Sequence, residues 1–312
     1  MDLNKKKVLI TGGAGFIGSN LVMEVQEKYP KAEIFVIDNL SSGNSKNLLG
    51  FKGDIITDSI LNVNLDRIFP KLDVIFHQAA ITDTIIPKNE EQKVIYENVE
   101  SFRRILDYAF SHNTHLIYAS SSGIYGNSTP PMKVGQGENP LNAYAVSKLI
   151  QDNIARKYFD LFEKKNLKLV GLRYFIVYGP KEYYKVTKEK GSLIWKFYTQ
   201  MKEGKRPVLF DNGKQKRDFV YVKDVTEINL LSLETKRNGI FNVGTGKAIN
   251  FNKIINILNK FLKTNLQPEY QENPFKDSYQ YYTEADIAET KELLNWKPKY
   301  TLEQGIKDYL NP

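Results

Sequence analysis

Tyr144 and Lys148 stand four residues apart in the segment Tyr-Ala-Val-Ser-Lys. On a helix this spacing puts both side chains on one face, so the phenol and the ammonium can point into one pocket. A phenol with its ordinary pKa of about 10 is a poor base near neutral pH, but a neighbouring cation stabilises the phenolate and lowers that pKa. Three serines ahead of this helix, Ser120, Ser121 and Ser122, place a hydroxyl donor near the same pocket. The phenol, the ammonium and one of these hydroxyls could together exchange a proton with a substrate hydroxyl.

A glycine motif near the start of the chain indicates a nucleotide cofactor. Gly12, Gly15 and Gly18 follow an apolar segment and open a predicted helix. Glycines at this spacing permit a tight turn, close approach of the backbone to a pyrophosphate, and close packing of helix on strand, while N–H groups at the helix start face the phosphates. Asp38 ends the next predicted strand, where an acid binds the adenosine ribose. The motif predicts a bound NAD or NADP.

Three more segments could border the same cofactor. Asp54 and Ile55 could bracket an adenine ring. Another predicted strand is followed by residues that would let the cofactor lie against the backbone, namely Gln78, Ala79 and Ala80. The preceding His77 is interpreted as a packed residue at the strand end and not as a catalyst. Asn98 could contact the cofactor or cap a helix N terminus.

The first half of the chain alternates short apolar segments with segments of helical periodicity. Strands are predicted at Lys7–Thr11, Glu33–Asp38, Val74–His77, Leu116–Ser120 and Lys168–Tyr174. Helices are predicted between them at Ile17–Tyr29, Val99–Phe110 and Val146–Lys165. Strands that alternate with helices indicate right-handed crossovers and a parallel sheet covered on both faces. The sequence therefore predicts an α/β fold with a Rossmann-type doubly wound parallel sheet.

The regular alternation of apolar strands and helices ends near Ile176. Strands are predicted at Val208–Phe210 and Gly239–Val243, and helices at 192–203, 251–262 and 284–295. The segment Arg217–Leu233 and the strand Gly239–Val243 are interpreted as a return to the first sheet. We expect two lobes with a cleft between them, each lobe built from more than one segment of the chain. An NAD(P)-binding lobe would comprise residues 1–175 plus about 216–245, and a smaller α/β substrate-binding lobe would comprise about 176–215 plus 246–312.

The composition argues against several other classes of protein. The 312 residues are 41% hydrophobic, enough to bury a substantial core, unlike disordered or disulfide-stapled chains. The lack of cysteine excludes disulfides, iron–sulfur clusters and thiol nucleophiles, and three histidines argue against a His-rich site, so no metal is expected. No apolar stretch reaches the roughly 18 residues of a membrane span, which predicts a cytoplasmic protein. The net charge of +8 is first interpreted as the basic surface of a cytosolic protein; the alternative is a phosphate-bearing small substrate, which is favoured over nucleic acid because nucleic-acid-binding motifs are missing.

Segments spread over the chain resemble the extended short-chain dehydrogenase/reductase family of nucleotide-sugar enzymes. They are TGGAGFIGSN, VIDNL, YASSSGIYG, YAVSK, LRYFIVYGP and RDFVYVKDV, and the likeness runs from about Val8 to Leu310. The resemblance implies an NAD(P) cofactor, a nucleotide-diphosphate sugar as substrate, a homo-oligomer, and a catalytic set of Ser121, Tyr144 and Lys148. The cofactor-binding residues are then Gly12, Gly15, Phe16, Ile17, Gly18, Asp38, Asn39, Asp54, Ile55, Gln78, Ala79, Ala80, Asn98, Tyr144, Lys148 and Val177.

Within that family, the second half of the chain is similar to the ADP-glyceromanno-heptose 6-epimerases of lipopolysaccharide biosynthesis. The resemblance implies an isomerase that oxidises a sugar carbon to a ketone and reduces it again with the same bound cofactor. It makes Lys190 a second acid/base, with a solvated lysine in a Lys-rich loop as the alternative. Independently of the family, the planar fork of Arg217 suits a diphosphate. The implied substrate contacts are Ser121, Ser192, Phe210, Asp211, Gly213, Arg217 and Tyr279.

Two positions depart from the heptose-epimerase pattern. Ile176 stands where the family has an asparagine that hydrogen-bonds the sugar, so that contact is lost or supplied elsewhere. The loop after Asp38 resembles the NAD-type loop of UDP-hexose 4-epimerases, and only Lys46 lies near the position of a base for the 2′-phosphate of NADP. A UDP-hexose 4-epimerase, a nucleotide-sugar dehydratase and a non-catalytic NAD(P)-binding protein are the alternatives. Residues 122–124 lack the acidic pair that usually follows the serine in a dehydratase.

Overall fold

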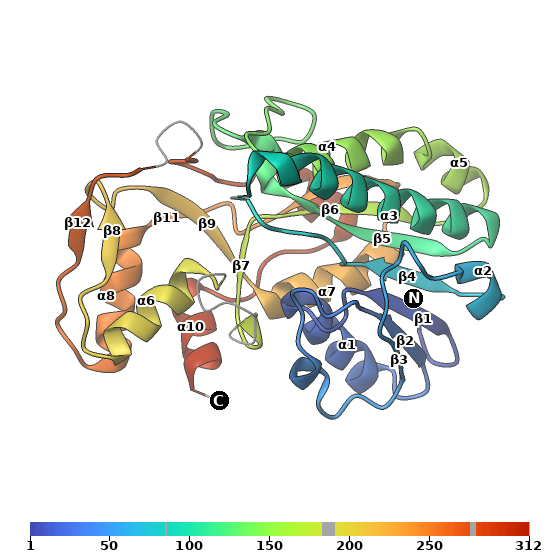
Figure 1. Cartoon of the computed structure of the whole chain (residues 1–312), viewed down its shortest axis with the longest axis horizontal. Coiled ribbons are helices and arrows are strands. Elements are labelled where there is room, and N and C mark those ends of the chain that lie inside the picture. Colours follow the sequence, from blue (N-terminus) through green and yellow to red (C-terminus); the bar gives the residue numbers. More distant parts are fainter. Residues whose placement is uncertain (85, 183–190, 275–278, 312) are drawn as a thin grey trace.

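The computed structural model describes residues 1–84, 86–182, 191–274 and 279–311, which form two lobes side by side (Figure 1). The larger lobe is built on a seven-stranded sheet in the order β10-β6-β5-β4-β1-β2-β3, with every neighbouring pair parallel. The strands are β1 (Lys7–Thr11), β2 (Glu33–Ile37), β3 (Asp54–Ile56), β4 (Val74–His77), β5 (His115–Ser121), β6 (Leu169–Tyr174) and β10 (Gly239–Val243). The predicted doubly wound α/β architecture is confirmed.

Side chains that alternate along each strand give the sheet two apolar faces. In β1, Val8 and Ile10 belong to one buried cluster and Leu9 belongs to another. Helices cover both faces (Figure 1). The first cluster includes α1 (Phe16–Lys28), α7 (Val222–Leu231) and α9 (Ala288–Leu294). The second includes α2 (Leu65–Ile68), α3 (Glu91–Ser111), α4 (Ala143–Arg156) and α5 (Phe159–Lys164).

The direction in which the sheet grows reverses between β1 and β4. From β1 the chain builds outward to β2 and β3, and then returns to the other side of β1 to form β4, β5 and β6. Ligands of open α/β sheets bind at such a reversal, beside the carboxyl ends of the strands. The glycine motif follows β1 and residues 78–80 follow β4, so the fold brings both predicted cofactor segments to this edge.

The smaller lobe carries two short sheets. In one, β9 (Lys216–Tyr221) lies between β7 (Ile176–Tyr178) and β11 (Ala248–Asn250); in the other, β8 (Val208–Phe210) pairs with β12 (Glu269–Gln271). Three helices pack around a third apolar cluster, namely α6 (Leu193–Lys202), α8 (Phe251–Leu262) and α10 (Leu302–Leu310). Ile17 and Val177 contact both this cluster and the first cluster of the larger lobe. The two lobes therefore meet at these two side chains.

The predicted strands are present within one residue of their predicted ends, whereas several helices differ. The helix predicted at Val99–Phe110 begins earlier, at Glu91. Its start was missed because the first turns are mostly exposed and lack an apolar periodicity. The helix predicted at Val146–Lys165 is broken, since the N–H groups of Lys157 and Tyr158 bond three residues back and end α4. None of the helices in the described ranges is long and apolar enough to cross a membrane.

One part of the predicted chain path is wrong. Within the segment Arg217–Leu233, α7 packs on the larger lobe, but the strand β9 pairs with β7 and β11 in the smaller lobe. The reason is that β10 occupies the place beside β6 at the end of the large sheet. The strands β3, β7, β11 and β12 have three residues each, too few for a recognisable alternation. The other lobe boundaries stay a prediction.

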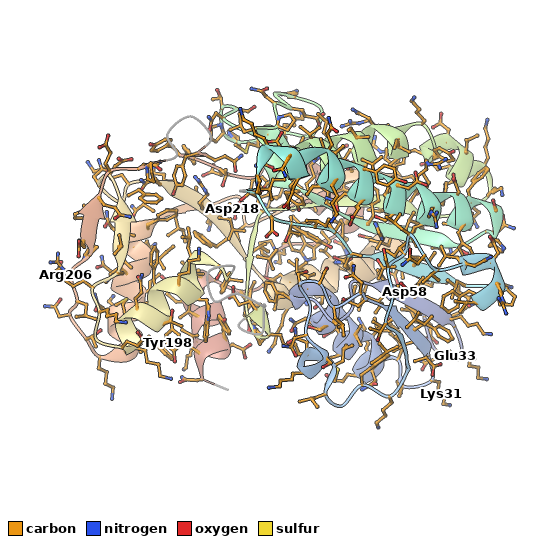
Figure 2. All side chains as sticks on the ribbon, viewed as in Figure 1. Lys31, Glu33, Asp58, Tyr198, Arg206 and Asp218 are labelled. Carbon is orange, nitrogen blue, oxygen red and sulfur yellow. The ribbon has the colours of Figure 1, made fainter. Side chains whose placement is uncertain are left out.

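Asp218 of β9 lies where the two lobes adjoin (Figure 2). Its side chain is fully buried. The carboxylate accepts hydrogen bonds from the backbone N–H groups of Thr245 (2.7 Å), Gly246 (2.8 Å) and Ala285 (3.2 Å), and from the Thr245 hydroxyl (2.6 Å). The loop after β10 and the segment before α9 are thus both fixed by one side chain.

Asp218→Ala should lower the free energy of unfolding by about 3 kcal/mol, because several buried donors lose their acceptor. Urea unfolding followed by circular dichroism measures this change. Asp107→Ala is the matched control, since Asp107 is exposed on α3 and its loss should change stability by no more than about 0.5 kcal/mol. Equal stability of the two variants would remove Asp218 from its structural role.

Candidate active site

The glycine motif forms the turn between β1 and α1. Gly12 has a φ of 68°, and a Cβ there would lie 2.7 Å from the backbone nitrogen of Ala79. A Cβ on Gly18 would lie 2.1 Å from the carbonyl oxygen of Gly12, so glycine is needed for the helix to start this close to the strand. No described side chain caps α1 at Gly15. An uncapped helix start behind a glycine turn fits a pyrophosphate, with the helix dipole favouring the negative charge.

Asp38 follows β2 at the same edge of the sheet. Its buried carboxylate accepts hydrogen bonds from the backbone N–H groups of Ala14 (2.9 Å) and Leu40 (2.8 Å). Each oxygen keeps a further lone pair and can still accept from a ribose hydroxyl. In the loop that follows, Asn39 is exposed, and Asn47 donates to the carbonyl of Ala14 (2.9 Å). The arrangement fits the adenosine end of a dinucleotide.

Two further cofactor candidates lie on β3, the outermost strand next to β2. Both Asp54 and Ile55 are exposed, and 46% of the Ile55 surface is accessible. The strand pairs with the last residues of β2, and its Ile56 carbonyl accepts from the N–H of Asp38 (3.1 Å). An exposed apolar side chain on the strand next to β2 suits an adenine ring, and contact with adenine stays a prediction.

The segment after β4 consists of the half-buried residues Gln78, Ala79 and Ala80. His77, the last residue of β4, is buried with its Nδ1 2.8 Å from the hydroxyl of Thr11. Burial lowers the pKa of His77 to about 3, and the charge of Lys148 adds to this effect. The ring is therefore neutral at physiological pH and packed as predicted, which leaves it no part in acid–base chemistry.

Asn98 is the eighth residue of α3, so the alternative of a helix N-cap is wrong. Its side-chain oxygen accepts from the N–H of Ile81 (2.8 Å). Its amide donates to the carbonyl of Ile81 (3.0 Å) and to the hydroxyl of Ser147 (3.0 Å). Both amide hydrogens thus fix the chain after β4 and the helix α4. A contact between Asn98 and the cofactor stays a prediction.

The structure brings Ser121, Tyr144 and Lys148 together at the carboxyl end of β5. Ser121 is the last residue of β5, and its hydroxyl accepts from the N–H of Gly123 (3.1 Å) and hydrogen-bonds Tyr144. The side chain of Asn142 caps α4, which places Tyr144 in the first turn. One turn later, the Lys148 Nζ lies 5.9 Å from the centroid of the Tyr144 ring. The phenol and the ammonium share one face of α4, as their spacing predicts.

Lys148 is 1% exposed and binds α4 to the sheet. Its Nζ donates to the backbone carbonyl of Ala119 in β5 (2.8 Å) and to the side-chain oxygen of Gln151 (3.2 Å). Burial lowers the pKa of Lys148 to about 8, and the charge of Asp152 opposes the fall. The ammonium form therefore prevails at neutral pH.

Burial raises the pKa of Tyr144 in the protein alone, whereas the sequence predicts a lower pKa once both Lys148 and the charged ring of a bound cofactor lie beside the phenol; that lowering stays a prediction. A hydrogen bond with Ser121 opposes the rise. The Lys148 ammonium lies 5.9 Å from the ring centre and directs two of its hydrogens to Ala119 and Gln151. A phenolate at Tyr144 therefore needs more positive charge than Lys148 supplies.

Asp152 is a buried residue that the sequence analysis missed. Its carboxylate accepts hydrogen bonds from the hydroxyls of Tyr118 (2.9 Å) and Ser120 (2.9 Å) and from Nε of Arg173 (2.9 Å). These bonds tie α4 to β5 and β6 immediately before Ser121. The available signal was an acid four residues after Lys148, hence on the same helix face.

Arg217 is the predicted diphosphate ligand, and it is a buried cation on β9. Its side chain is 6% exposed, and its guanidinium carbon lies 5.1 Å from the centroid of the Tyr279 ring. Burial lowers the pKa of Arg217 to about 10, and Tyr279 opposes the fall, so the group stays charged at neutral pH. It donates to the carbonyl of Lys216 (3.2 Å), and within the described ranges no carboxylate forms a recorded ion pair with it. Such a guanidinium is suited to bind an anion.

Several other predicted substrate residues lie in the same lobe, between β8 and β9 or beside them. Phe210 and Tyr279 meet edge to face with their ring centroids 5.8 Å apart. Asp211 has a φ of 51°, and its carboxylate accepts from the hydroxyl of Tyr281 (3.2 Å). Gly213 has a φ of 65° in the turn that leads to β9. The aromatic side chains and the turn offer a surface for a flat base next to Arg217.

Three residues that the sequence places at the sugar site, Ser192, Ile176 and Lys190, differ in what the structure shows for them. Ser192 caps α6 by accepting from the N–H of Trp195 (3.3 Å), and its hydroxyl donates to Glu182 (3.0 Å). Ile176 is half-buried and packs against the third cluster. Lys190 lies outside the described residues.

Across the described part of the chain, no group of three or more His, Cys, Asp or Glu could hold a metal ion.

Gly12→Ala should weaken the binding of NAD at least tenfold, because the new methyl would collide with the backbone at Ala79. Gly204→Ala is the matched control, since Gly204 has a similar φ of 74° with nothing within 4 Å of a Cβ. Both variants carry the backbone strain of about 1–2 kcal/mol, and only Gly12→Ala adds the collision. Isothermal titration with NAD distinguishes them, and equal affinities would exclude the glycine turn from the cofactor site.

Comparison with known proteins agrees with this geometry. A model of the NAD dependent epimerase/dehydratase family matches residues 8–244. ADP-L-glycero-D-manno-heptose-6-epimerase of Helicobacter pylori is 39% identical with a TM-score of 0.89, over 100% of this chain and 97% of that chain. UDP-N-acetylglucosamine 4-epimerase of Methanobrevibacter ruminantium M1 is 29% identical with a TM-score of 0.88, over 98% and 97%. UDP-glucose 4-epimerase of Thermotoga maritima is 29% identical with a TM-score of 0.86, over 98% and 97%.

These matches confirm the resemblance that the sequence motifs predict. The family match spans most of the chain and includes the glycine turn, Asp38, Ser121, Tyr144 and Lys148. The chain belongs to the NAD dependent epimerase/dehydratase family and is an isomerase, a nucleotide-sugar epimerase that uses NAD or NADP.

Proposed function

We propose that the chain is an ADP-glycero-manno-heptose 6-epimerase. The observation that carries this substrate assignment is the 39% identity over the whole chain to the Helicobacter pylori heptose epimerase, against 29% for the two 4-epimerases. The reaction type is supported by the grouping of Ser121, Tyr144 and Lys148 at the end of β5.

The proposed reaction inverts one sugar carbon through a ketone. NAD(P), when bound, supplies a positive charge and a hydride acceptor for that carbon, and the same hydride for its return. Tyr144 takes the proton of the sugar hydroxyl, Ser121 donates a hydrogen bond to the same oxygen, and Lys148 adds positive charge beside the phenolate. A rotation about the C5–C6 bond then presents the other face of the ketone. One hydride and one proton leave and return, so no net redox change occurs.

Residues of the smaller lobe are proposed to hold the substrate. The buried guanidinium of Arg217 supports a role in binding the diphosphate, because it carries a charge at neutral pH without a recorded carboxylate partner among the described residues. Lys190 is proposed as the acid/base for the second face of the ketone, a role that rests on the family resemblance. Further proposed contacts are Ser192, Phe210, Asp211, Gly213 and Tyr279.

The identity of the dinucleotide rests on the loop after β2. An acidic side chain at Asp38, held by Ala14 and Leu40, favours a ribose 2′-hydroxyl over a 2′-phosphate. This preference supports NAD. Lys46, which is exposed in the same loop, is the base that NADP would require.

A UDP-hexose 4-epimerase is the second candidate. Two observations favour it, namely the NAD-type loop after Asp38 and the apolar Ile176 in place of a sugar-binding asparagine. A pyranose ring carbon needs the whole sugar to turn over in the site, and one tyrosine can then serve both faces. That route does not require Lys190 as an acid or a base.

Separate incubations of the purified protein with ADP-heptose and with UDP-glucose distinguish the two candidates. We expect NMR of the products to show inversion at C6 of the heptose and no conversion of UDP-glucose. Turnover of UDP-glucose alone would reject the heptose assignment and support the 4-epimerase. In the same assay, Lys190→Ala should abolish inversion of the heptose if a second acid/base is used, and a near-normal rate would assign both proton transfers to Tyr144.

Tyr144→Phe should lower kcat by about 10²- to 10⁴-fold, the usual contribution of a positioned acid–base group. NAD should still bind, since the phenyl ring keeps the packing of α4. Tyr96→Phe is the control, because the Tyr96 side chain is 63% exposed on α3 and residues two apart on a helix, such as Tyr96 and Asn98, do not face each other. Unchanged turnover in Tyr144→Phe would remove Tyr144 from the mechanism.

A further inference from the structure

The Lys148 ammonium is held by two protein acceptors from different elements. Its Nζ donates to the carbonyl of Ala119 on β5 (2.8 Å) and to the side-chain oxygen of Gln151 on α4 (3.2 Å). An ammonium carries three N–H donors, and the described residues contain no recorded third acceptor. One N–H of the ammonium therefore has no acceptor among the described residues and is available to a ligand.

The orientation of the Gln151 amide is fixed by its second contact. Gln151 is fully buried, and its Nε2 donates to the backbone carbonyl of Asn98 in α3 (2.7 Å). Because only the NH₂ end can donate to a carbonyl, the oxygen end must face Lys148. Gln151 thus links the backbone of α3 to the ammonium. The nearby hydroxyl of Ser147 accepts from the Asn98 side chain (3.0 Å) and donates to the Tyr144 carbonyl (2.7 Å), and it is not one of the two acceptors of the Lys148 ammonium.

The other titratable groups around Lys148 leave Gln151 as its side-chain acceptor. From β4, the His77 ring is neutral and its Nδ1 faces the hydroxyl of Thr11. On α4 itself, Tyr144 presents its ring 5.9 Å from Nζ. The Asp152 carboxylate, one turn later, is engaged by β5 and β6. The contacts that Lys148 and Gln151 receive from β5 and α3 are the backbone carbonyls of Ala119 and Asn98, respectively.

We propose that Gln151 is a positioning residue that makes Lys148 a fixed charge instead of a carrier of protons to solvent. This inference rests on the proposed function, because an epimerase takes one proton from the sugar hydroxyl and returns one. Over a complete cycle the sugar loses one proton and gains one, so there is no net release of protons to solvent, whether Tyr144 alone or Tyr144 and Lys190 together carry the transfers. A lysine that is 1% exposed, with two hydrogens bound to protein acceptors, suits that balance. The third N–H hydrogen of Lys148 remains available to a ligand bound next to Tyr144.

Two substitutions at Gln151 separate this role from a structural one. Gln151→Glu and Gln151→Met both lose the amide donor to the Asn98 carbonyl, so any structural damage from that loss is common to them. They differ at Lys148, where Gln151→Glu places a carboxylate against the ammonium and Gln151→Met places no acceptor. A carboxylate raises the pKa of a neighbouring ammonium by about one unit or more. Loss of a hydrogen bond to the charged form lowers it by about one unit.

The first measurement is kcat for epimerisation as a function of pH. Turnover requires the ammonium, so it falls as the pH rises through the pKa of Lys148. On the alkaline side of the profile of kcat against pH, we expect the pH of half-maximal kcat to rise by about one unit or more in Gln151→Glu and to fall by about one unit in Gln151→Met. Ser147→Ala, which disturbs the same helix interface, should keep the half-maximal pH of the wild type. Identical values in all variants, or shifts of the same sign in both Gln151 variants, would overturn the proposal.

The second measurement needs no substrate. In protein labelled with [¹³Cε]lysine, the Lys148 resonance is assigned by its loss in Lys148→Arg and titrated by NMR. The pKa of Lys148 should decrease from Gln151→Glu through wild type to Gln151→Met. If this order holds while neither nucleotide sugar is converted, the proposed function fails and the positioning role stands. If epimerisation is normal and the order is not found, the positioning role fails alone.

Discussion

A positive charge held out of water beside a phenol is the constraint on which the rest of the site depends. An ammonium is costly to bury unless it finds acceptors, and Lys148 finds them in Ala119 of β5 and in Gln151. These contacts fix α4 against the sheet at the level of Tyr144. One turn further, Asp152 binds β5 and β6 through three donors. One face of α4 therefore carries both the reacting groups and the bonds that anchor them.

Burial of this pair also decides when it can act. It lowers the pKa of Lys148 to about 8 and raises that of Tyr144, with the Ser121 hydrogen bond opposing the rise. The protein alone therefore keeps a neutral phenol. The reversal of strand order between β1 and β4 puts the proposed dinucleotide site next to the same edge of the sheet, where a positive charge favours the phenolate. We therefore expect the basicity of Tyr144 to depend on occupancy of the proposed dinucleotide site.

Local patterns in the sequence predicted much of this arrangement. Apolar runs gave the strands of the large sheet, and the spacings of the glycines and of Tyr144 and Lys148 predicted the turn and the shared helix face. Features that depend on distant partners were missed. Gln151 and Asp152 acquire their roles from carbonyls and hydroxyls on α3 and β5, and β9 was misplaced because β10 occupies the position beside β6. The burial that raises the pKa of Tyr144 in the protein alone also depends on distant partners and cannot be read from spacing.

Retention of the carbon-bound hydrogen tests most directly whether this site removes and returns a hydride within one closed pocket. Epimerisation is run in D₂O on substrate with protium at the inverted carbon, and the product is analysed by NMR and mass spectrometry. A hydride withdrawn and restored by a bound dinucleotide predicts a product with protium at that carbon and no incorporated deuterium. Deuterium at the inverted carbon would contradict the account, because it would show loss of a carbon-bound proton to solvent.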